Sequence, residues 1–165
     1  MNDRWRYSAV SITPYNPIYR GENGEYLKSD IFSVSDVGKS MKFNDYLKIE
    51  NAYIESIKVI MLLTKCSSLS IRYLEKQSLP LCFSEEEEQI LNDTYFSLVD
   101  KQIITNENLE VIMRLILRNS VWCDLVNLSK RLYVRFGYDY YMYFNTKLKV
   151  EEYKEHIEKI GLFVC

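Results

Sequence analysis

The sequence has few of the residues that build common catalytic and metal sites. It contains one histidine, His156, and five glycines among its 165 residues. It holds no glycine-rich phosphate loop, no dinucleotide-binding fingerprint and no H-E-x-x-H motif. Its four cysteines, Cys66, Cys82, Cys123 and Cys165, form no C-x-x-C pair and match no zinc-ligand spacing. We therefore expect free thiols, and a protein that is not an enzyme and has no catalytic, cofactor-binding or metal-binding residues.

The sequence also lacks an excess of basic charge and any long apolar run. Its formal net charge is −2 and its isoelectric point is about 5.6. A nucleic-acid-binding protein normally needs a basic surface that neutralises phosphates, so we expect no direct binding to nucleic acid. The apolar run at residues 59–63 is far too short to span a bilayer, and the first ten residues contain no apolar stretch typical of a secretory signal. We expect a cytoplasmic protein that makes no membrane contact.

Hydrophobic periodicity predicts both strands and helices. Alternation predicts strands over residues 4–13, 68–74, 121–127, 131–136 and 139–145, with a terminal strand after Gly161. Spacing of three and four predicts helices over residues 44–65, after Ser84, after Thr105 and over 150–160. Asn44 or Asp45 is the expected cap of the first helix, and Ser84 with Glu87 forms a capping box.

These elements predict the fold class. Residues 14–42 are predicted to form a long ordered loop, with a small hairpin at Asn23-Gly24. A chain of this length suits one domain, and no internal repeat, linker or low-complexity tract divides it. We expect a single α+β domain, residues 1–165, in which about four helices pack against an antiparallel sheet.

Tyrosine is abundant, with 14 residues, and five of them lie between positions 133 and 143. In the stretch LYVRFGYDYYMYF, residues 132–144, the even positions are all apolar or aromatic. The odd positions mix tyrosine with Arg135, Gly137 and Asp139. Because a strand places alternate side chains on opposite faces, Phe136, Tyr140 and Met142 should be buried and Tyr141 and Tyr143 more exposed.

A hairpin with its tip at residues 137–139 suits this stretch, since a straight strand of this length would be unusual. It would pair Phe136 with Tyr140, Val134 with Met142 and Leu132 with Phe144. A single strand kinked at Gly137 would sort the two faces equally well. The outer tyrosines have two interpretations: they cover a sheet, or they bind a protein, because tyrosine and arginine are enriched at interfaces.

A second feature is a concentration of acids. Residues 84–110 contain eight acids and one base, Lys101. Carboxylates in a first helical turn complement the helix dipole, which is one explanation for residues 85–88. The alternatives are metal ligands or a docking patch, and the surrounding acids favour the patch, because such a concentration creates a field that steers a basic partner.

Three segments together resemble a bacterial protein family. They are WRYS near the start, YNPIYRGENGEYLKSD with SVSDVGK after it, and WCDL followed by LYVRFGYDYYMYF. The pattern resembles one group of immunity proteins of contact-dependent growth inhibition systems. The resemblance implies a cytoplasmic protein that binds and blocks the toxin domain of a cognate surface effector, often a nuclease. It implies no catalytic residues and says little about architecture.

The preferred hypothesis is therefore a stoichiometric inhibitor of a cognate toxin domain, which we expect to be a nuclease such as a ribonuclease. Acids can mimic phosphates and aromatic side chains can anchor the complex. One alternative is a small enzyme that uses Glu50, Glu55 or Asp139 for acid–base chemistry, and another is a general interaction adaptor. The candidate toxin-binding residues are Glu85, Glu86, Glu87, Asp93, Asp139, Tyr141 and Tyr143.

Overall fold

A seven-stranded antiparallel sheet organises the residues that the computed structural model describes, which are 10–28, 33–137 and 140–165. The strand order is β3-β2-β4-β5-β6-β1-β7. The strands are β1 Val10–Thr13, β2 Ser68–Lys76, β3 Ile103–Thr105, β4 Val121–Asn127, β5 Leu132–Phe136, β6 Met142–Asn145 and β7 Phe163–Val164. The helices are α1 Phe43–Leu63, α2 Glu85–Ser97, α3 Asn106–Leu117 and α4 Lys154–Ile160, with short 3-10 turns at Pro17–Tyr19, Val34–Asp36 and Val150–Glu152. The predicted α+β class is confirmed.

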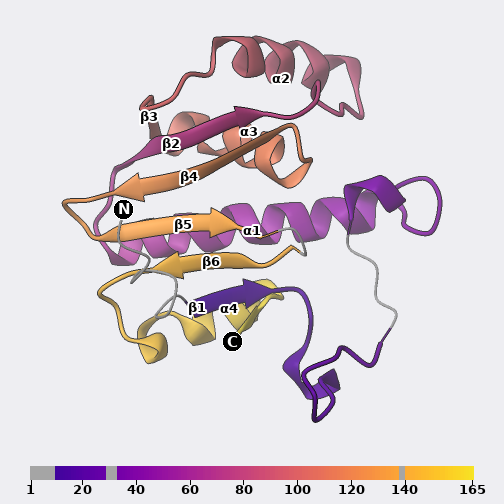
Figure 1. The fold of residues 1–165 in the computed structure, drawn as a ribbon, viewed down its shortest axis with the longest axis vertical. Helices are drawn as coiled ribbons and strands as arrows, with labels where there is room; N and C mark the ends of the chain where they lie inside the picture. Colours follow the sequence, from indigo (N-terminus) through magenta and orange to yellow (C-terminus); the bar gives the residue numbers. More distant parts are fainter. Residues whose placement is uncertain (1–9, 29–32, 138–139) are drawn as a thin grey trace.

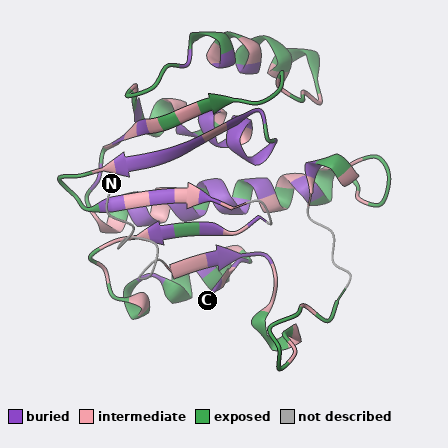
Figure 2. Cartoon of the chain, viewed as in Figure 1, coloured by how far each residue is buried: buried purple, intermediate pink, exposed green. Residues whose placement is uncertain are grey.

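The helices α1, α3 and α4 lie on one face of the sheet, and α2 packs against α3 beside β2 and β3 (Figure 1). Alternate residues of the strands point at this helical layer and are buried. Ile71, Leu125, Val134 and Phe144 are each at most 1% exposed, as is Ile57 of α1. Figure 2 shows the resulting pattern, with burial along the centre of the sheet and exposure along the outer side of α2. The core therefore lies between the sheet and one layer of helices.

The predicted strands are found, with differences at their ends. β4 covers the predicted residues 121–127, β2 extends two residues beyond the predicted 68–74, and β6 begins at Met142 rather than at residue 139. Of the strand expected over residues 4–13, Val10–Thr13 is observed and the remainder lies outside the described residues. The short strand β3 was not predicted, because three residues are too few to show alternation.

The stretch at residues 132–144 is a hairpin, but its register differs from the prediction. Phe136 pairs with Met142 and Val134 with Phe144, two residues away from the expected partners. A slip of two residues leaves every side chain on its predicted face. Phe136 and Met142 are 8% and 0% exposed, whereas Tyr143 is 40% exposed, so the predicted sorting of the faces is confirmed.

The register moves because Tyr140 leaves the strand. Its backbone has a φ of +56°, and its hydroxyl accepts a hydrogen bond from the backbone N–H of Val34 at 2.9 Å. The same hydroxyl donates to the carbonyl of Leu117 at 3.0 Å. The N–H of Gly137 donates to the carbonyl of Tyr141 at 2.7 Å and closes a longer loop than expected. The predicted tip residues Tyr138 and Asp139 lie outside the described residues.

The predicted caps of α2 and α4 and the predicted loop hairpin are found, whereas the predicted cap of α1 is not. Ser84 caps α2 as predicted, accepting a hydrogen bond from the N–H of Glu87. The second half of the predicted capping box differs, because the Glu87 carboxylate accepts from the N–H of Phe83 and not from that of Ser84. Gly161 ends α4 with a φ of +103°, and Gly24 has a φ of +85° in the predicted hairpin, which Arg20 and Tyr26 close. The predicted cap of α1 is wrong.

That helix, α1, begins at Phe43, with Lys42 in the cap position and no side-chain cap. The centroids of the Phe43 and Phe83 rings are 4.2 Å apart, and this packing favours a helix that already includes Phe43. Asp45 lies inside this turn, where it pairs with Lys48 at 2.8 Å instead of capping the helix.

Candidate protein-binding site

Several chain segments meet at one end of the sheet, which we call the hairpin end. β1, β2 and β5 finish there, and β4 and β6 begin there, because neighbouring strands run in opposite directions. The connections at this end bring together the first turns of α1 and α2, the last turn of α3, the loop of the β5–β6 hairpin and residues 14–28 (Figure 1). The two surfaces predicted from the sequence, the acids of α2 and the tyrosines of the hairpin, therefore lie at the same end of the molecule.

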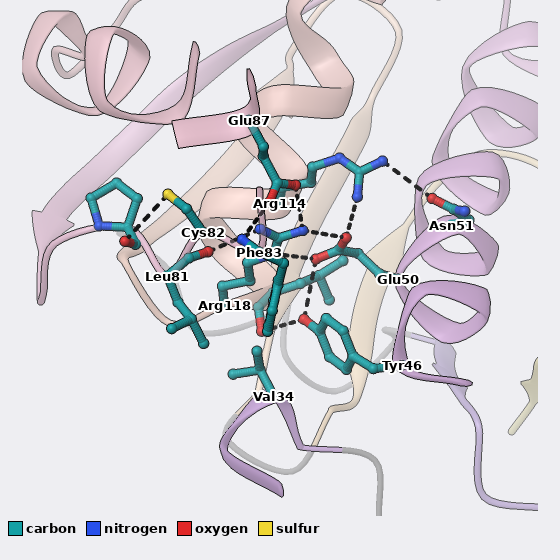
Figure 3. A network of polar contacts seen from close by, with 12 residues as sticks. Val34, Tyr46, Glu50, Asn51, Leu81, Cys82, Phe83, Glu87, Arg114 and Arg118 are labelled. Carbon is teal, nitrogen blue, oxygen red and sulfur yellow. Dashed lines mark hydrogen bonds and ion pairs between the residues drawn. The ribbon is translucent and has the colours of Figure 1, made fainter. Parts of the chain in front are cut away.

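A buried ion cluster of Glu50, Glu87, Arg114 and Arg118 joins the three helices at this end (Figure 3). Arg118 donates to Glu50 from Nε at 2.8 Å and from Nη2 at 2.9 Å. Its Nη2 also donates to Oε1 of Glu87 at 2.8 Å, and Nη1 of Arg114 donates to Oε2 of Glu50, the oxygen that Nη2 of Arg118 also binds. The side chains of Glu50 and Arg118 are 0% and 1% exposed, so both charges depend on each other for compensation.

The pKa shifts agree with this geometry. Burial alone would raise the pKa of Glu87, but hydrogen bonds from Arg118 and from the Phe83 N–H outweigh it, and the pKa is lowered. Burial likewise opposes the charge on Arg118, yet its bonds to Glu50 and Glu87 raise its pKa. Both groups therefore stay charged at neutral pH, and the ion pairs of the cluster connect α1, α2 and α3.

This cluster continues towards the hairpin through Tyr46. The Tyr46 hydroxyl lies 3.2 Å from Oε1 of Glu50 and 3.4 Å from the carbonyl of Leu117. The hydroxyl of Tyr140 donates to that same carbonyl, as described above. Burial, and then the charge of Glu50, raise the pKa of Tyr46. A continuous set of polar contacts thus runs from the first turn of α2 to the loop of the hairpin.

The ion cluster borders a largely apolar groove between α1, α2 and α3, with a volume of about 400 Å³. Three carboxylates belong to its lining, Glu86 and Glu87 on α2 and Glu110 on α3. Glu110 is paired with Arg114 at 2.7 Å. Glu86 is exposed and has no ion pair among the described residues. The groove is lined by Phe43, Leu47, Phe83, Ser84, Glu86, Glu87, Ile90, Leu91, Glu110, Val111 and Arg114.

Five tyrosine rings contact one another in series at the other side of the hairpin end. We call Tyr19, Tyr26, Tyr15, Tyr141 and Tyr143, in this order, the tyrosine ladder. Successive ring centroids are 6.4, 4.9, 5.8 and 6.1 Å apart. The guanidinium of Arg20 donates to the hydroxyl of Tyr141 at 2.6 Å and lies over its ring. The hairpin tyrosines and the loop tyrosines therefore form one aromatic surface.

The structure separates the predicted toxin-binding residues into three groups. Glu85, Glu86 and Asp93 are exposed on α2, and the carboxylate of Asp93 accepts a hydrogen bond from Gln89 at 2.7 Å. Tyr141 and Tyr143 belong to the tyrosine ladder, and Asp139 lies outside the described residues.

Glu87 stands apart from these groups. Its side chain is 20% exposed and accepts hydrogen bonds from Arg118 and from the N–H of Phe83. These contacts fix the position of α2. The prediction that it belongs to an open acidic patch therefore needs correction, because both of its carboxylate oxygens already have partners.

The acids suggested for a rival enzyme also have partners here. Glu50 is enclosed in the ion cluster, and Glu55 is an exposed residue of α1 paired with Lys58 at 2.7 Å. His156 is exposed on α4, beside the Glu155–Lys159 ion pair. Neither Glu50 nor Glu55 lines the groove.

Two features of the site were missed from the sequence, the buried ion pairing of Glu50 and the tyrosines of the loop. Glu50 occupies a position on the apolar stripe formed by Tyr46, Tyr53, Ile57 and Ile60, and a charge at that position signals a buried partner. The loop tyrosines were also missed, although Tyr15, Tyr19 and Tyr26 recur within 12 residues. Their meeting with the hairpin depends on tertiary structure.

Comparisons with known proteins give no relative for this chain. No protein-family model, no curated protein and no solved structure matches it. Within the described ranges, none of the helices has the length and apolar character needed to cross a membrane. In the same residues, no group of three or more His, Cys, Asp or Glu side chains is placed to hold a metal ion.

Proposed function

We propose that the chain is an immunity protein, a stoichiometric inhibitor that binds a basic bacterial toxin domain through its hairpin end. The observation that carries the proposal is the groove, whose lining combines apolar side chains with the carboxylates of Glu86 on α2 and Glu110 on α3. Its lining residues come from the first turns of α1 and α2 and from α3, and the first turns lie at the same end of the sheet as the β5–β6 hairpin and the tyrosine ladder. Protein interfaces combine a desolvated apolar centre with charged groups that select the partner and speed its approach.

The charge of this surface favours a basic partner. Glu85, Glu86 and Asp93 are exposed on α2, and Glu88 lies beside them in the first turn. Nuclease toxins tend to be basic because they hold nucleic-acid phosphates, so carboxylates can occupy the place of those phosphates. The tyrosine ladder supplies rigid rings, and Arg20 lies beside Tyr141; tyrosine and arginine are both typical of interface hot spots.

The resemblance to immunity proteins of contact-dependent growth inhibition systems supports the same assignment. In this proposal the chain acts in the cytoplasm of the toxin-producing cell and catalyses no reaction of its own. It covers the toxin by forming a tight complex, with no cofactor and no direct contact to nucleic acid or membrane. The gene should follow a gene for a large toxin protein.

The test is an inhibition titration against the toxin domain encoded beside this gene. The toxin domain is incubated with rising amounts of the purified chain, and its nuclease activity is measured on RNA and on DNA. The proposal predicts that activity falls linearly and disappears at one equivalent of the chain. Full nuclease activity in the presence of excess folded chain would contradict it.

A further inference from the structure

We propose that the groove between α1, α2 and α3 receives an arginine side chain of the toxin domain. This inference rests on the proposed function and identifies the chemical group that the groove binds. The arginine would place its aliphatic stem on the apolar walls and its guanidinium between Glu86 and Glu110. The contact would make the groove the specificity-determining part of the interface.

The shape of the groove suits a long side chain with an apolar stem. Leu47 on α1 and Val111 on α3 are half-buried lining residues, and Ile90 on α2 is 54% exposed. Leu91 is 1% exposed and lies deeper in the lining. Covering these side chains would remove apolar surface from water, which favours a partner that carries methylene groups.

The charges select a cation. The ion cluster that borders the groove is balanced, since Glu50 and Glu87 face Arg114 and Arg118. Glu86 and Glu110 add two further carboxylates to the lining, so these six groups together have an excess of two negative charges. Arg114 already occupies one side of Glu110, whereas Glu86 has no cation of the described chain beside it. An incoming cation would therefore meet Glu86 first.

Arginine fits this site better than lysine. Its planar guanidinium binds carboxylates through two N–H groups and stacks on aromatic rings, and it carries a weaker hydration shell into an interface. The groove offers such a ring in Phe43, which packs against Phe83. On the inner side, Arg118 already lies 4.9 Å from the centroid of the Phe83 ring. The chain thus uses the same recognition internally.

The test begins with variants of the chain and the purified toxin domain. Val111→Trp fills the groove and should raise the Kd at least 100-fold. Leu128→Trp adds the same ring at the β4–β5 turn, at the opposite end of the sheet, and should leave the Kd within twofold. The double variant Glu86→Gln, Glu110→Gln removes two exposed negative charges without adding bulk, and it should raise the Kd at least 30-fold. It tests the groove even if the Val111→Trp variant does not fold.

The second step identifies the arginine. Each arginine of the toxin domain is replaced by alanine, and its Kd is measured against the natural chain and against the Glu86→Gln, Glu110→Gln variant. Replacing one particular arginine should raise the Kd for the natural chain at least 30-fold but raise the Kd for the variant less than threefold. The two effects differ because the energies of residues in direct contact are not additive. If every arginine substitution changes the Kd by the same factor for both forms of the chain, this inference is wrong while the inhibitor proposal stands. The same holds if both groove variants bind the toxin domain as tightly as the natural chain does. If the natural chain forms no complex, both fail.

Discussion

Glu50 and Arg118 are two fully enclosed charges that determine how the helices meet at the hairpin end. Removing a charged group from water is costly, and the cost is offset here by three charge-assisted contacts to Glu50 and one to Glu87. A buried ion pair of this kind adds little stability compared with an apolar substitute, but the loss of one partner leaves the other uncompensated. Its contribution is therefore geometric, because it positions α2 relative to α1 and α3.

Replacing Arg118 with methionine should test this role. The substitution keeps a similar length but leaves Glu50 buried with Arg114 alone, and we expect a loss of about 3–5 kcal/mol in the free energy of unfolding. Urea titration followed by circular dichroism measures the change. Lys159→Met, which removes a surface pair on α4, is the control and should have a much smaller effect. Equal midpoints for the two variants would show that the cluster does not hold the helices together.

Glu87 gives the hairpin end a pH dependence. Its pKa in the fold is lowered from its usual value of 4.5, so its ionised form stabilises the fold above that pH. The contribution is lost as the pH falls below 4.5 through the folded-state pKa. Glu87→Gln should cost about 1–3 kcal/mol at pH 7, and the difference from the natural chain should shrink below pH 4.5. Urea titrations at pH 7, 5 and 3.5 measure this, and a difference that stays constant with pH would contradict the assignment.

At the scale of elements, the β5–β6 hairpin shows what a sequence can and cannot predict. The alternation of side chains correctly predicted which residues face the core, because a strand has a period of two whatever its partner. The register was wrong by two residues, since it depends on the hydroxyl of Tyr140 reaching Val34 and Leu117. Those contacts span more than 20 residues along the chain, so no local pattern reveals them.

The two faces of this hairpin should differ in stability. Phe136→Ala removes a ring that is 8% exposed and packs on Tyr53, and it should cost about 3–5 kcal/mol. Tyr143→Ala removes a ring that is 40% exposed and should cost much less. Denaturant titration of both variants measures the ranking. The reverse order would mean that the faces of the hairpin are assigned incorrectly.

The candidate site shows the same division between local pattern and tertiary contact. Ser84 and the acids of α2 were found from the sequence, because capping and helix polarity are local properties. The groove was not found, since it needs Phe43, Ile90 and Val111 from three helices. Glu87 was interpreted as a surface acid because its partner Arg118 lies 31 residues away.

At the scale of the whole molecule, the distribution of charge over the surface affects association with a basic partner more than the net charge does. The chain carries a net charge of −2, while exposed acids gather on α2 at the hairpin end. Oriented charge of this kind speeds the approach of a basic partner and is screened by salt. Association should therefore be fast and should slow as ionic strength rises.

Charge reversal on α2 should reveal this steering. Glu86→Lys with Asp93→Lys should slow association with the toxin domain about tenfold or more and flatten its dependence on salt. Glu155→Lys with Glu158→Lys makes the same change in net charge on α4, away from α2 (Figure 1), and should slow association much less. Surface plasmon resonance at two salt concentrations measures both variants. Equal association rates for the two variants would remove α2 from the interface.

The most direct test of the central claim is a hydrogen–deuterium exchange footprint of the chain with and without the neighbour-encoded toxin domain. The complex should have a Kd of about 1 nM or lower, because protection in a cell requires almost complete occupancy. Peptides from residues 14–28, from the first turns of α1 and α2 and from residues 77–84 should exchange more slowly in the complex. Peptides from the β4–β5 turn should be unchanged. A complex that protects the β4–β5 turn and leaves the hairpin end unchanged would contradict the account.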